Sequence, residues 1–521
     1  MSTLSAIPAQ PEAPCAHVDV LIVGAGLSGI GAARHLQVNC PGKSYAILEA
    51  RERIGGTWDL FRYPGIRSDS DMYTLGYVFR PWEDAKAIAD GSSILDYVRQ
   101  TARDHGIEQK IRFGHRAVRA EYSSADARWI VTAQLGDTPE TVQLTCDFLF
   151  MCSGYYRYDE GYTPEFPGSE RFAGQIVHPQ HWSEDIDYAG KRVVVIGSGA
   201  TAITLVPAMA RTAAHVTMLQ RSPSYIVSMP GEDRIANFLR RKLPAKTAYS
   251  IVRWKNVLRT MLSFEVSRRR PDWIRALVRK GVQQALPPDY DIDTHFNPKY
   301  DPWDQRLCLV PDGDLFRVLR DGSASIATDQ IATFTESGIE LESGTTLEAD
   351  LIVTATGLNL LALGGIELAV DGREIELSQT LGYRGMMLSD VPNFAFAVGY
   401  TNASWTLKCD LTCEYMCRLL NHMDAHGYQQ CVARNRDPSV QALPFIDFSS
   451  GYVLRSIDKF PKQGSKPPWR LYQNYPRDIL SLRRNPVEDG VMEFSRARAA
   501  TAGATRPAAS GELELAAQAT A

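Results

Sequence analysis

The chain has 521 residues, of which 44% are hydrophobic and 22% are charged, and its formal net charge is −4. This composition is typical of a globular protein of two or three domains, and the small acidic excess argues against a nucleic-acid-binding protein. Nine cysteines without clustered spacing indicate reduced, intracellular thiols rather than a disulfide framework.

The two ends of the chain differ in composition from the rest. Residues 1–16 are rich in Pro and Ala and lack a basic segment followed by an apolar run, so we expect a flexible lead-in without a secretory signal. Residues 496–521 are rich in Ala, Thr and Gly and predict a disordered tail. No transmembrane span is expected, because glycines at turn positions interrupt the longest apolar segments.

The first motif follows an apolar strand at 18–23 and opens a helical pattern with Gly24-x-Gly26-x-x-Gly29. Such glycines permit a tight turn, a close approach of the backbone to a pyrophosphate and packing of the helix on the strand. A second strand ends on Glu49, whose carboxylate can accept hydrogen bonds from a ribose diol. The motif predicts an adenine-dinucleotide site, the alternative being a glycine-rich turn that binds nothing. The predicted contacts are Gly24, Gly26, Leu27, Ser28, Gly29 and Glu49.

The pattern recurs after a strand at 193–196. The next strand ends on Gln220 and Arg221, where an NAD-binding turn would carry an acid. A guanidinium in place of the carboxylate favours the 2′-phosphate of NADP(H), unless Arg221 is only a solvated surface residue. Two turns imply two cofactors, one resident and one exchanging. The predicted contacts are Gly197, Ser198, Gly199, Ala200, Thr201, Ala202, Gln220, Arg221 and Ser222.

Two apolar strands run into small residues, at Ser153-Gly154 and at Ala355-Thr356-Gly357. They indicate that the chain leaves a first domain and later re-enters it. Ala355, Thr356 and Gly357 are further predicted cofactor contacts. The fold class is therefore α/β, with two dinucleotide-binding, Rossmann-like domains, the second inserted in the first. The expected boundaries are 17–154 and 385–495 for the first domain, which would bind the resident cofactor, 155–222 and 320–384 for the NADP-binding domain, and 223–319 for a helical insertion.

Residues 55–69, "GGTWDLFRYPGIRSD", match the pattern [AG]GxWxxxx[FY]P[GM]xxxD at every fixed position. With the two turns, this loop resembles the type I Baeyer–Villiger monooxygenases, a group of flavin-dependent enzymes. The resemblance implies that the loop wraps the flavin and that Asp69 orients a catalytic arginine; the alternative is an aromatic-rich structural loop. The implied cofactor contacts are Gly56, Thr57, Trp58, Asp69 and Tyr73.

The segment "FAGQIVHPQHWSED" matches the family fingerprint FxGxxxHxxxW at Phe172, Gly174, His178 and Trp182, while Ser183 departs from the Pro or Asp expected there. Trp182 favours the Baeyer–Villiger branch over flavin monooxygenases that oxidise amines and sulfides. The resemblance implies that this linker couples domain motion to catalysis. We predict no metal site at its two histidines, because no set of Cys, Asp and Glu ligands lies nearby.

The segment 300–320 resembles the family region that carries an essential arginine, which implies a catalytic role for Arg306 unless that residue is paired on the surface. Gln305 stands where other members often have Lys. A helix that begins near Trp405 is implied to face the flavin with its N-terminus. Cysteines at 409, 413 and 417 share one face of that helix and are expected to be buried, and the absence of CxxC argues against a dithiol reductase.

Residues 234–280 hold 14 Lys and Arg but only two acids, Glu265 and Asp272. Basic amphipathic helices can lie on an anionic membrane, but they also occur as insertions that show a charged face to solvent. We favour the second interpretation and keep peripheral membrane contact as a hypothesis.

The resemblance implies an FAD- and NADPH-dependent monooxygenase that uses O2 to convert a ketone to an ester or lactone through a C4a-peroxyflavin. A subgroup likeness implies long or hydrophobic ketones and sulfur compounds as substrates. The alternatives are hydroxylation of long alkyl chains, oxidation of S or N atoms, and an NADPH-oxidising redox sensor without organic substrate. The expected location is the cytoplasm, with membrane association left open.

Overall fold

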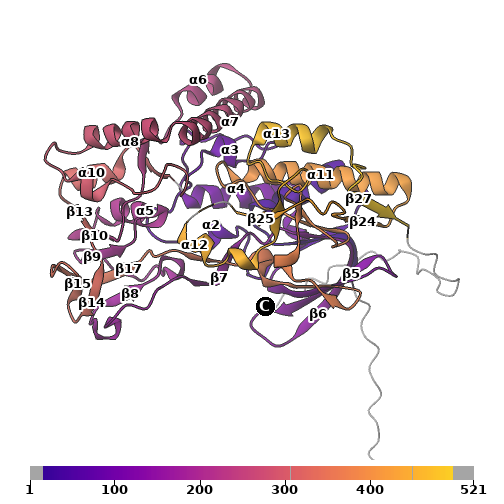
Figure 1. Cartoon of the computed structure of the whole chain (residues 1–521), viewed down its shortest axis with the longest axis horizontal. Helices are drawn as coiled ribbons and strands as arrows, with labels where there is room; N and C mark the ends of the chain where they lie inside the picture. The colour runs from indigo at the N-terminus through magenta and orange to yellow at the C-terminus, as the bar shows by residue number, and fades with distance from the viewer. Residues whose placement is uncertain (1–15, 306, 447, 449, 497–521) are drawn as a thin grey trace, which may run out of the picture.

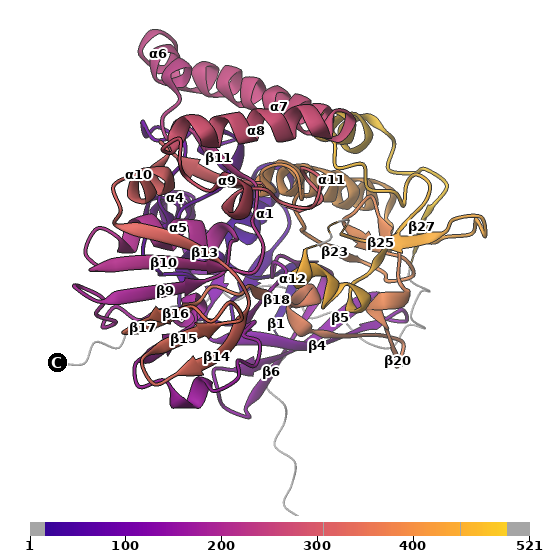
Figure 2. The ribbon, with the colours of Figure 1, turned by 60° about the vertical axis from the view of Figure 1, so that its left-hand side comes forward.

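The computed structural model describes residues 16–305, 307–446, 448 and 450–496. Two sheets with their covering helices lie side by side, and a layer of helices, α6 to α8 (residues 234–285), runs along one edge of the molecule (Figure 1 and Figure 2). The predicted fold class, two Rossmann-like α/β units with a helical insertion, is confirmed.

The first unit is built on a nine-stranded sheet in the order β20-β19-β4-β5-β6-β1-β2-β3, with β23 paired to β6. Its central strand β1 (Ala16–Val23) is parallel to β2 (Tyr45–Leu48) and β6 (Thr141–Met151). Helices cover the sheet, so the second half of β1, residues 20–23, is a continuous apolar run whose Leu21 and Ile22 are fully buried. The other strands are β3 (Ile111–Arg112), β4 (His115–Ser123), β5 (Arg128–Leu135), β19 (Glu367–Val370), β20 (Arg373–Glu374) and β23 (Phe394–Phe396).

Helix α1 (Leu27–Asn39) follows β1 and packs against α11 (Trp405–His426), which lies on the same side of the sheet. The predicted helix start at Trp405 is therefore correct. The remaining elements of this unit are α2 (Thr57–Leu60), α3 (Met72–Leu75), α4 (Gly91–Asp104), β21 (Gly382–Tyr383), β22 (Met387–Leu388), β24 (Gln430–Ala433), β25 (Ala442–Pro444), α12 (Gly451–Leu454), β26 (Lys462–Gly464), α13 (Tyr475–Ile479) and β27 (Met492–Ser495).

The second unit is built on a parallel five-stranded sheet in the order β13-β10-β9-β17-β8. Helix α5 (Ala200–Met209) follows β9 and packs against α10 (Asp314–Arg320). The strands are β8 (Gln175–Val177), β9 (Arg192–Ile196), β10 (His215–Gln220), β13 (Ala324–Thr328) and β17 (Leu351–Thr354), with a small antiparallel sheet of β14 (Ile331–Thr335), β15 (Gly338–Leu341) and β16 (Thr346–Glu348) beside them.

The chain passes between the two units twice, in adjacent antiparallel strands. β7 (Tyr156–Gly161) carries it out of the first unit, and β18 (Leu358–Leu360) carries it back. This is the nested order expected from the small residues at 153–154 and 355–357.

Two of the predicted boundaries need correction. β19 and β20 pair with β4 in the first sheet, so the chain re-enters that sheet near residue 367 and not at 385. The two strands are short and half polar, which gives a weak periodic signal. The insertion also ends before 319, because Leu315 and Phe316 of α10 are buried in the core of the second unit.

The insertion consists of α6 (Arg234–Lys242), α7 (Ala245–Arg269), α8 (Pro271–Ala285) and α9 (Ile292–His295). It is flanked by two parallel strands, β11 (Ile226–Met229) and β12 (Cys308–Pro311). Among the helices that the structure describes, none is long and apolar enough to cross a membrane.

Candidate active site

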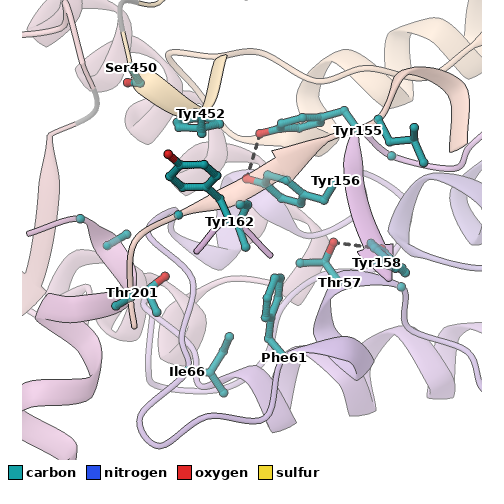
Figure 3. A pocket seen from close by; sticks show the side chains of 18 of the residues that line it. Thr57, Phe61, Ile66, Tyr155, Tyr156, Tyr158, Tyr162, Thr201, Ser450 and Tyr452 are labelled. Carbon is teal, nitrogen blue, oxygen red and sulfur yellow. Dashed lines mark hydrogen bonds between the residues drawn. The ribbon is translucent and has the colours of Figure 1, made fainter. Parts of the chain in front are cut away.

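A cavity of about 1200 Å³ lies between the two units and receives both glycine-rich turns, the loop that starts at Gly55 and the crossing strands. Figure 3 shows a wall of aromatic side chains from these segments, including Phe61, Tyr155, Tyr156 and Tyr162. A volume of this size can receive extended cofactors together with a substrate.

The first turn is shaped to bring backbone amides to the cavity. Gly24 has φ +107°, and a Cβ there would lie 2.6 Å from the Cys152 carbonyl oxygen. Gly26, the residue before α1, lines the cavity, and no side chain caps the helix. The first amide N–H groups of α1 therefore lack a capping acceptor from the chain and can meet a phosphate.

Glu49 joins this turn to the end of β2. Its buried carboxylate accepts hydrogen bonds from the Ala25 amide at 2.7 Å and the Arg51 amide at 3.0 Å. Burial raises the pKa of Glu49 above its ordinary value, and the two amides oppose that shift. Glu49 lines the cavity, as a ribose-binding acid must.

The second turn repeats the geometry. Gly197 has φ +137°, and a Cβ there would lie 2.3 Å from the Ala355 carbonyl oxygen, whereas a Cβ on Gly199 would meet no atom within 4 Å. Helix α5 begins after Gly199 without a side-chain cap. Arg221 and Ser222, at the end of β10, are exposed and line the same cavity. Within the described part of the chain, Arg221 makes no ion pair, so its charge is available to a phosphate.

The loop after Gly55 is held by one buried carboxylate. Asp59 accepts from Arg51 at 2.6 Å, from Arg62 at 3.1 Å and from Arg99 at 3.0 Å, and it is 1% exposed. Three cations fix the loop at a single point, so the cavity-lining residues Gly56, Thr57 and Trp58 are presented on a rigid segment.

Trp405, at the start of α11, is positioned by contacts with Ser28, which follows the first turn, and with Tyr155. Its indole Nε1 donates to the Ser28 hydroxyl at 2.9 Å, and its ring stacks on Tyr155 at 5.1 Å between centroids. Helix α11 has no side-chain cap at Ser404, and its first residue, Trp405, lines the cavity, so the N-terminus of the helix lies at the cavity edge. Further along, Cys409, Cys413 and Cys417 are buried, and burial raises the pKa of the Cys409 thiol to about 12.

Aromatic groups form the cavity wall beside Trp405. The hydroxyls of Tyr155 and Tyr156 lie 3.0 Å apart, and those of Thr57 and Tyr158 lie 3.2 Å apart (Figure 3). Burial raises the pKa of Tyr158 to about 12, so its phenol stays protonated at neutral pH. This part of the cavity wall is therefore mainly aromatic, with phenol hydroxyls at its surface.

The fingerprint residues do not line the cavity. Phe172 is buried in a small core of the second unit, and a Cβ on Gly174 would lie 2.6 Å from the Asp350 carbonyl oxygen. His178 Nε2 lies 3.1 Å from the Gly357 carbonyl oxygen, and Trp182 packs on the core of the second unit. These positions agree with a role in holding the crossing segments rather than in bond chemistry.

Arg306 lies outside the described residues. Its neighbours Gln305 and Leu307 both line the cavity, as does the exposed Asp69. The loop that carries Asp69 is tied to α10 by an ion pair between Arg67 and Asp314, with 2.5 Å between Nη1 and Oδ2.

Four predicted cofactor contacts do not line the cavity. Gly29 serves packing, because a Cβ there would lie 1.8 Å from the Gly24 carbonyl oxygen, and Ala202 is fully buried behind the second turn. The amide of Gln220 donates to His295 O and Thr328 Oγ1. Tyr73 is fully buried beside Tyr249. A motif position adjacent to a ligand loop can point into the core, which the one-dimensional pattern does not reveal. The other predicted contacts, from Gly24 to Trp405, line the cavity.

Sequence reasoning missed several residues at the cavity. The guanidinium of Arg455 lies 3.4 Å from the centre of the Tyr162 ring, and both residues line the cavity. Arg51 and Tyr158 were also unassigned. Arg51 follows Glu49 closely enough to have been suspected, but Arg455 sits in a segment without motif or periodicity.

Two dinucleotide turns that open onto one cavity define a protein that binds two nucleotide cofactors in neighbouring α/β units. The family model described as flavin-binding monooxygenase-like matches residues 18–361, and the chain belongs to this family. The predicted resemblance and the prediction of a flavin-dependent monooxygenase are therefore confirmed.

Individual relatives agree with this assignment. The chain is 57% identical over 481 residues to the FAD-containing monooxygenase EthA of Mycobacterium tuberculosis, which covers 92% of this chain and 98% of the relative. It is 49% identical over 483 residues to the probable FAD-binding monooxygenase AlmA of Acinetobacter sp, covering 92% and 96%. An oxidized steroid monooxygenase bound to NADP has the same fold, with a TM-score of 0.72 at 22% identity over 92% of this chain and 100% of that one.

Proposed function

We propose that this enzyme inserts one oxygen atom of O2 next to a ketone carbonyl and releases an ester or lactone, at the expense of NADPH. The observation that carries the proposal is the meeting of both nucleotide turns, Asp69 and the chain on either side of Arg306 in one cavity. Support comes from solved relatives of the same fold, one of them a cyclohexanone monooxygenase with cyclohexanone bound.

The residues present fit FAD at the first turn and NADPH at the second. Gly26 and the uncapped start of α1 would receive the FAD pyrophosphate, and Glu49 the ribose. Gly199 and α5 would receive the NADPH pyrophosphate, and Arg221 the 2′-phosphate. Bound FAD supplies hydride acceptance from NADPH and activation of O2.

The chain itself supplies charge. Arg306 is a permanent cation in a segment whose two neighbours line the cavity, and it would stabilise negative charge on the substrate oxygen as that charge develops. Such stabilisation by one donor contributes about 3 kcal/mol to the transition state. Asp69 would orient the guanidinium.

The aromatic residues of the cavity wall favour a hydrophobic ketone over a polar one. Phe61, Tyr155, Tyr156 and Tyr452 face this part of the cavity (Figure 3). Among the described cavity residues none selects against a thioether, so oxidation of sulfur is retained as a side reaction. The proposed location is the cytoplasm.

The test compares Arg306→Ala and Arg306→Lys with Gln305→Ala, a neighbouring cavity residue, as the control. Arg306→Ala should lower ester formation from a 2-alkanone by about 100-fold while flavin reduction by NADPH remains measurable. Arg306→Lys should recover part of the loss, because lysine keeps the positive charge but lacks the paired N–H donors of the guanidinium. Ester formation at the wild-type rate in Arg306→Ala would contradict the assignment.

A further inference from the structure

The insertion carries an unusual share of the exposed apolar surface. Eight of the fifteen exposed large hydrophobic side chains of the described residues lie on α6, α7 and α8, which make up less than a tenth of the chain. The most exposed are Leu262 at 66%, Phe238 at 59% and Trp273 at 59%. Figures 1 and 2 show the three helices together along one outer edge of the molecule. A concentration of this kind marks a binding surface.

These side chains form stripes at helical spacing. On α7 the stripe is Ile251, Trp254, Leu258 and Leu262. On α6 it is Ile235 and Phe238, and on α8 it is Trp273 and Leu277. The spacing of three or four residues places each set on one face of its helix.

The orientation of α7 is fixed by a buried cation on its other face. Arg253 is 5% exposed, and its Nη1 donates to the carbonyl oxygens of Tyr73 at 2.9 Å and Gly76 at 2.8 Å. Its Nη2 lies 3.3 Å from Asp410 in α11. A rotation of α7 that buried the stripe would separate the Arg253 guanidinium from these partners. The contacts of Arg253 therefore keep the stripe on the outer face of α7.

The same helices carry a large excess of positive charge. Of the 14 Lys and Arg between 234 and 280, seven are exposed and have no carboxylate partner among the described residues. Lys242 follows Ile235 by seven residues on α6, and Lys280 follows Trp273 by seven residues on α8. Both lysines therefore share a face with the apolar side chains. The seven are Arg234, Arg241, Lys242, Lys246, Arg259, Arg270 and Lys280.

We propose that the face of α6, α7 and α8 binds the surface of an anionic lipid bilayer. The apolar stripes enter the boundary between headgroups and acyl chains, the two exposed tryptophans sit at that boundary, and the seven unpaired cations contact lipid phosphates. A second copy of the chain fits this face poorly, because a two-fold contact would bring the same cations together. The inference is independent of the substrate.

The experiment is co-sedimentation of the purified, flavin-loaded full chain with vesicles of phosphatidylcholine alone or mixed with phosphatidylglycerol. The protein should bind the mixed vesicles about tenfold more tightly, and binding should weaken as salt rises. Two variants test the two components: Leu258→Ser with Leu262→Ser removes part of the stripe, and Lys242→Glu with Lys280→Glu reverses two charges. Each should lose about tenfold in affinity.

Matched controls come from other surfaces. Ile130→Ser removes an apolar side chain that is 38% exposed on β5, and Lys110→Glu with Lys459→Glu reverses two exposed charges elsewhere. These variants should bind as the wild type does, and all variants should keep the wild-type Tm. Equal binding to both kinds of vesicle, or wild-type binding by the insertion variants, would overturn the proposal. A lipid-free dimer that the insertion variants abolish would also overturn it, in favour of a second copy.

Discussion

His178 Nε2 lies 3.1 Å from the carbonyl oxygen of Gly357, across the two strands that connect the nucleotide-binding units. The Gln180 amide donates to Nδ1 of the same ring, so Nε2 carries the proton and donates to Gly357. A Cβ on Gly161 would lie 2.0 Å from the ring, so the imidazole packs directly on the backbone of Gly161. The fingerprint histidine thus fastens the outgoing segment of the chain to the returning one.

Removal of this contact should uncouple NADPH oxidation from product formation. In His178→Ala we expect NADPH oxidation to continue while product formation falls, because the Gly357 carbonyl keeps only the hydrogen bond from the Tyr162 amide and the second unit is held less firmly. Hydrogen peroxide released for each NADPH consumed measures the effect. His181→Ala is the control, since its exposed side chain lies on the same short segment. Equal peroxide release by both variants would contradict the role of His178.

The same histidine predicts a pH dependence of stability. Burial lowers the pKa of His178 below its ordinary value of 6.5, and its hydrogen bond to Gly357 and the charge of His181 are smaller effects. The unfolded chain therefore binds the proton more readily, so the contribution of neutral His178 is complete above pH 6.5 and is lost as the pH falls below that value. The Tm difference between the wild type and His178→Asn should shrink between pH 7 and pH 5. A constant difference would show that His178 titrates alike in both states.

The second turn offers two glycines with opposite expected behaviour. Gly199→Ala places a methyl group in open space, so Tm should be unchanged while KM for NADPH rises on the order of tenfold. Gly197→Ala forces a left-handed backbone and a contact with Ala355, which costs ~1–3 kcal/mol and lowers Tm. Thermal unfolding and steady-state kinetics separate the two effects. A fall in Tm for Gly199→Ala would argue that this turn serves packing alone.

Arg221 should set the choice of nicotinamide cofactor. Loss of one charge-assisted contact to the 2′-phosphate costs ~1.5–3 kcal/mol, so Arg221→Ala should lower kcat/KM for NADPH by about 10- to 100-fold. The value for NADH should hardly change, because NADH lacks that phosphate. Arg434→Ala, which removes a half-buried arginine of the first unit paired with Asp390 and Glu493, is the control. A parallel loss with both cofactors would assign Arg221 a structural role.

Features that depend on local sequence could be predicted. The glycine turns, the acid at Glu49 and the start of α11 at Trp405 each depend on backbone geometry within a short segment. The nested order also follows from small residues at the crossings. Weak edge strands such as β19 carry too little periodicity to set the boundary at 367.

Contacts between distant segments could not be predicted. The three arginines around Asp59, the link from Arg67 to Asp314 and the packing of Arg455 on Tyr162 depend on the folded arrangement. Tyr73 shows the opposite error: it was predicted as a cofactor contact because it lies beside a motif, but its side chain is buried in the core. One sequence gives the order of motifs but not the direction of each side chain.

The most direct test of the proposed oxidation is incubation of the enzyme with NADPH, a 2-alkanone and ¹⁸O2, followed by mass analysis of the product. The account predicts an ester that carries a single labelled oxygen, formed in an amount equal to the NADPH consumed. Consumption of NADPH with only hydrogen peroxide as product, or a hydroxylated alkanone in place of the ester, would contradict it.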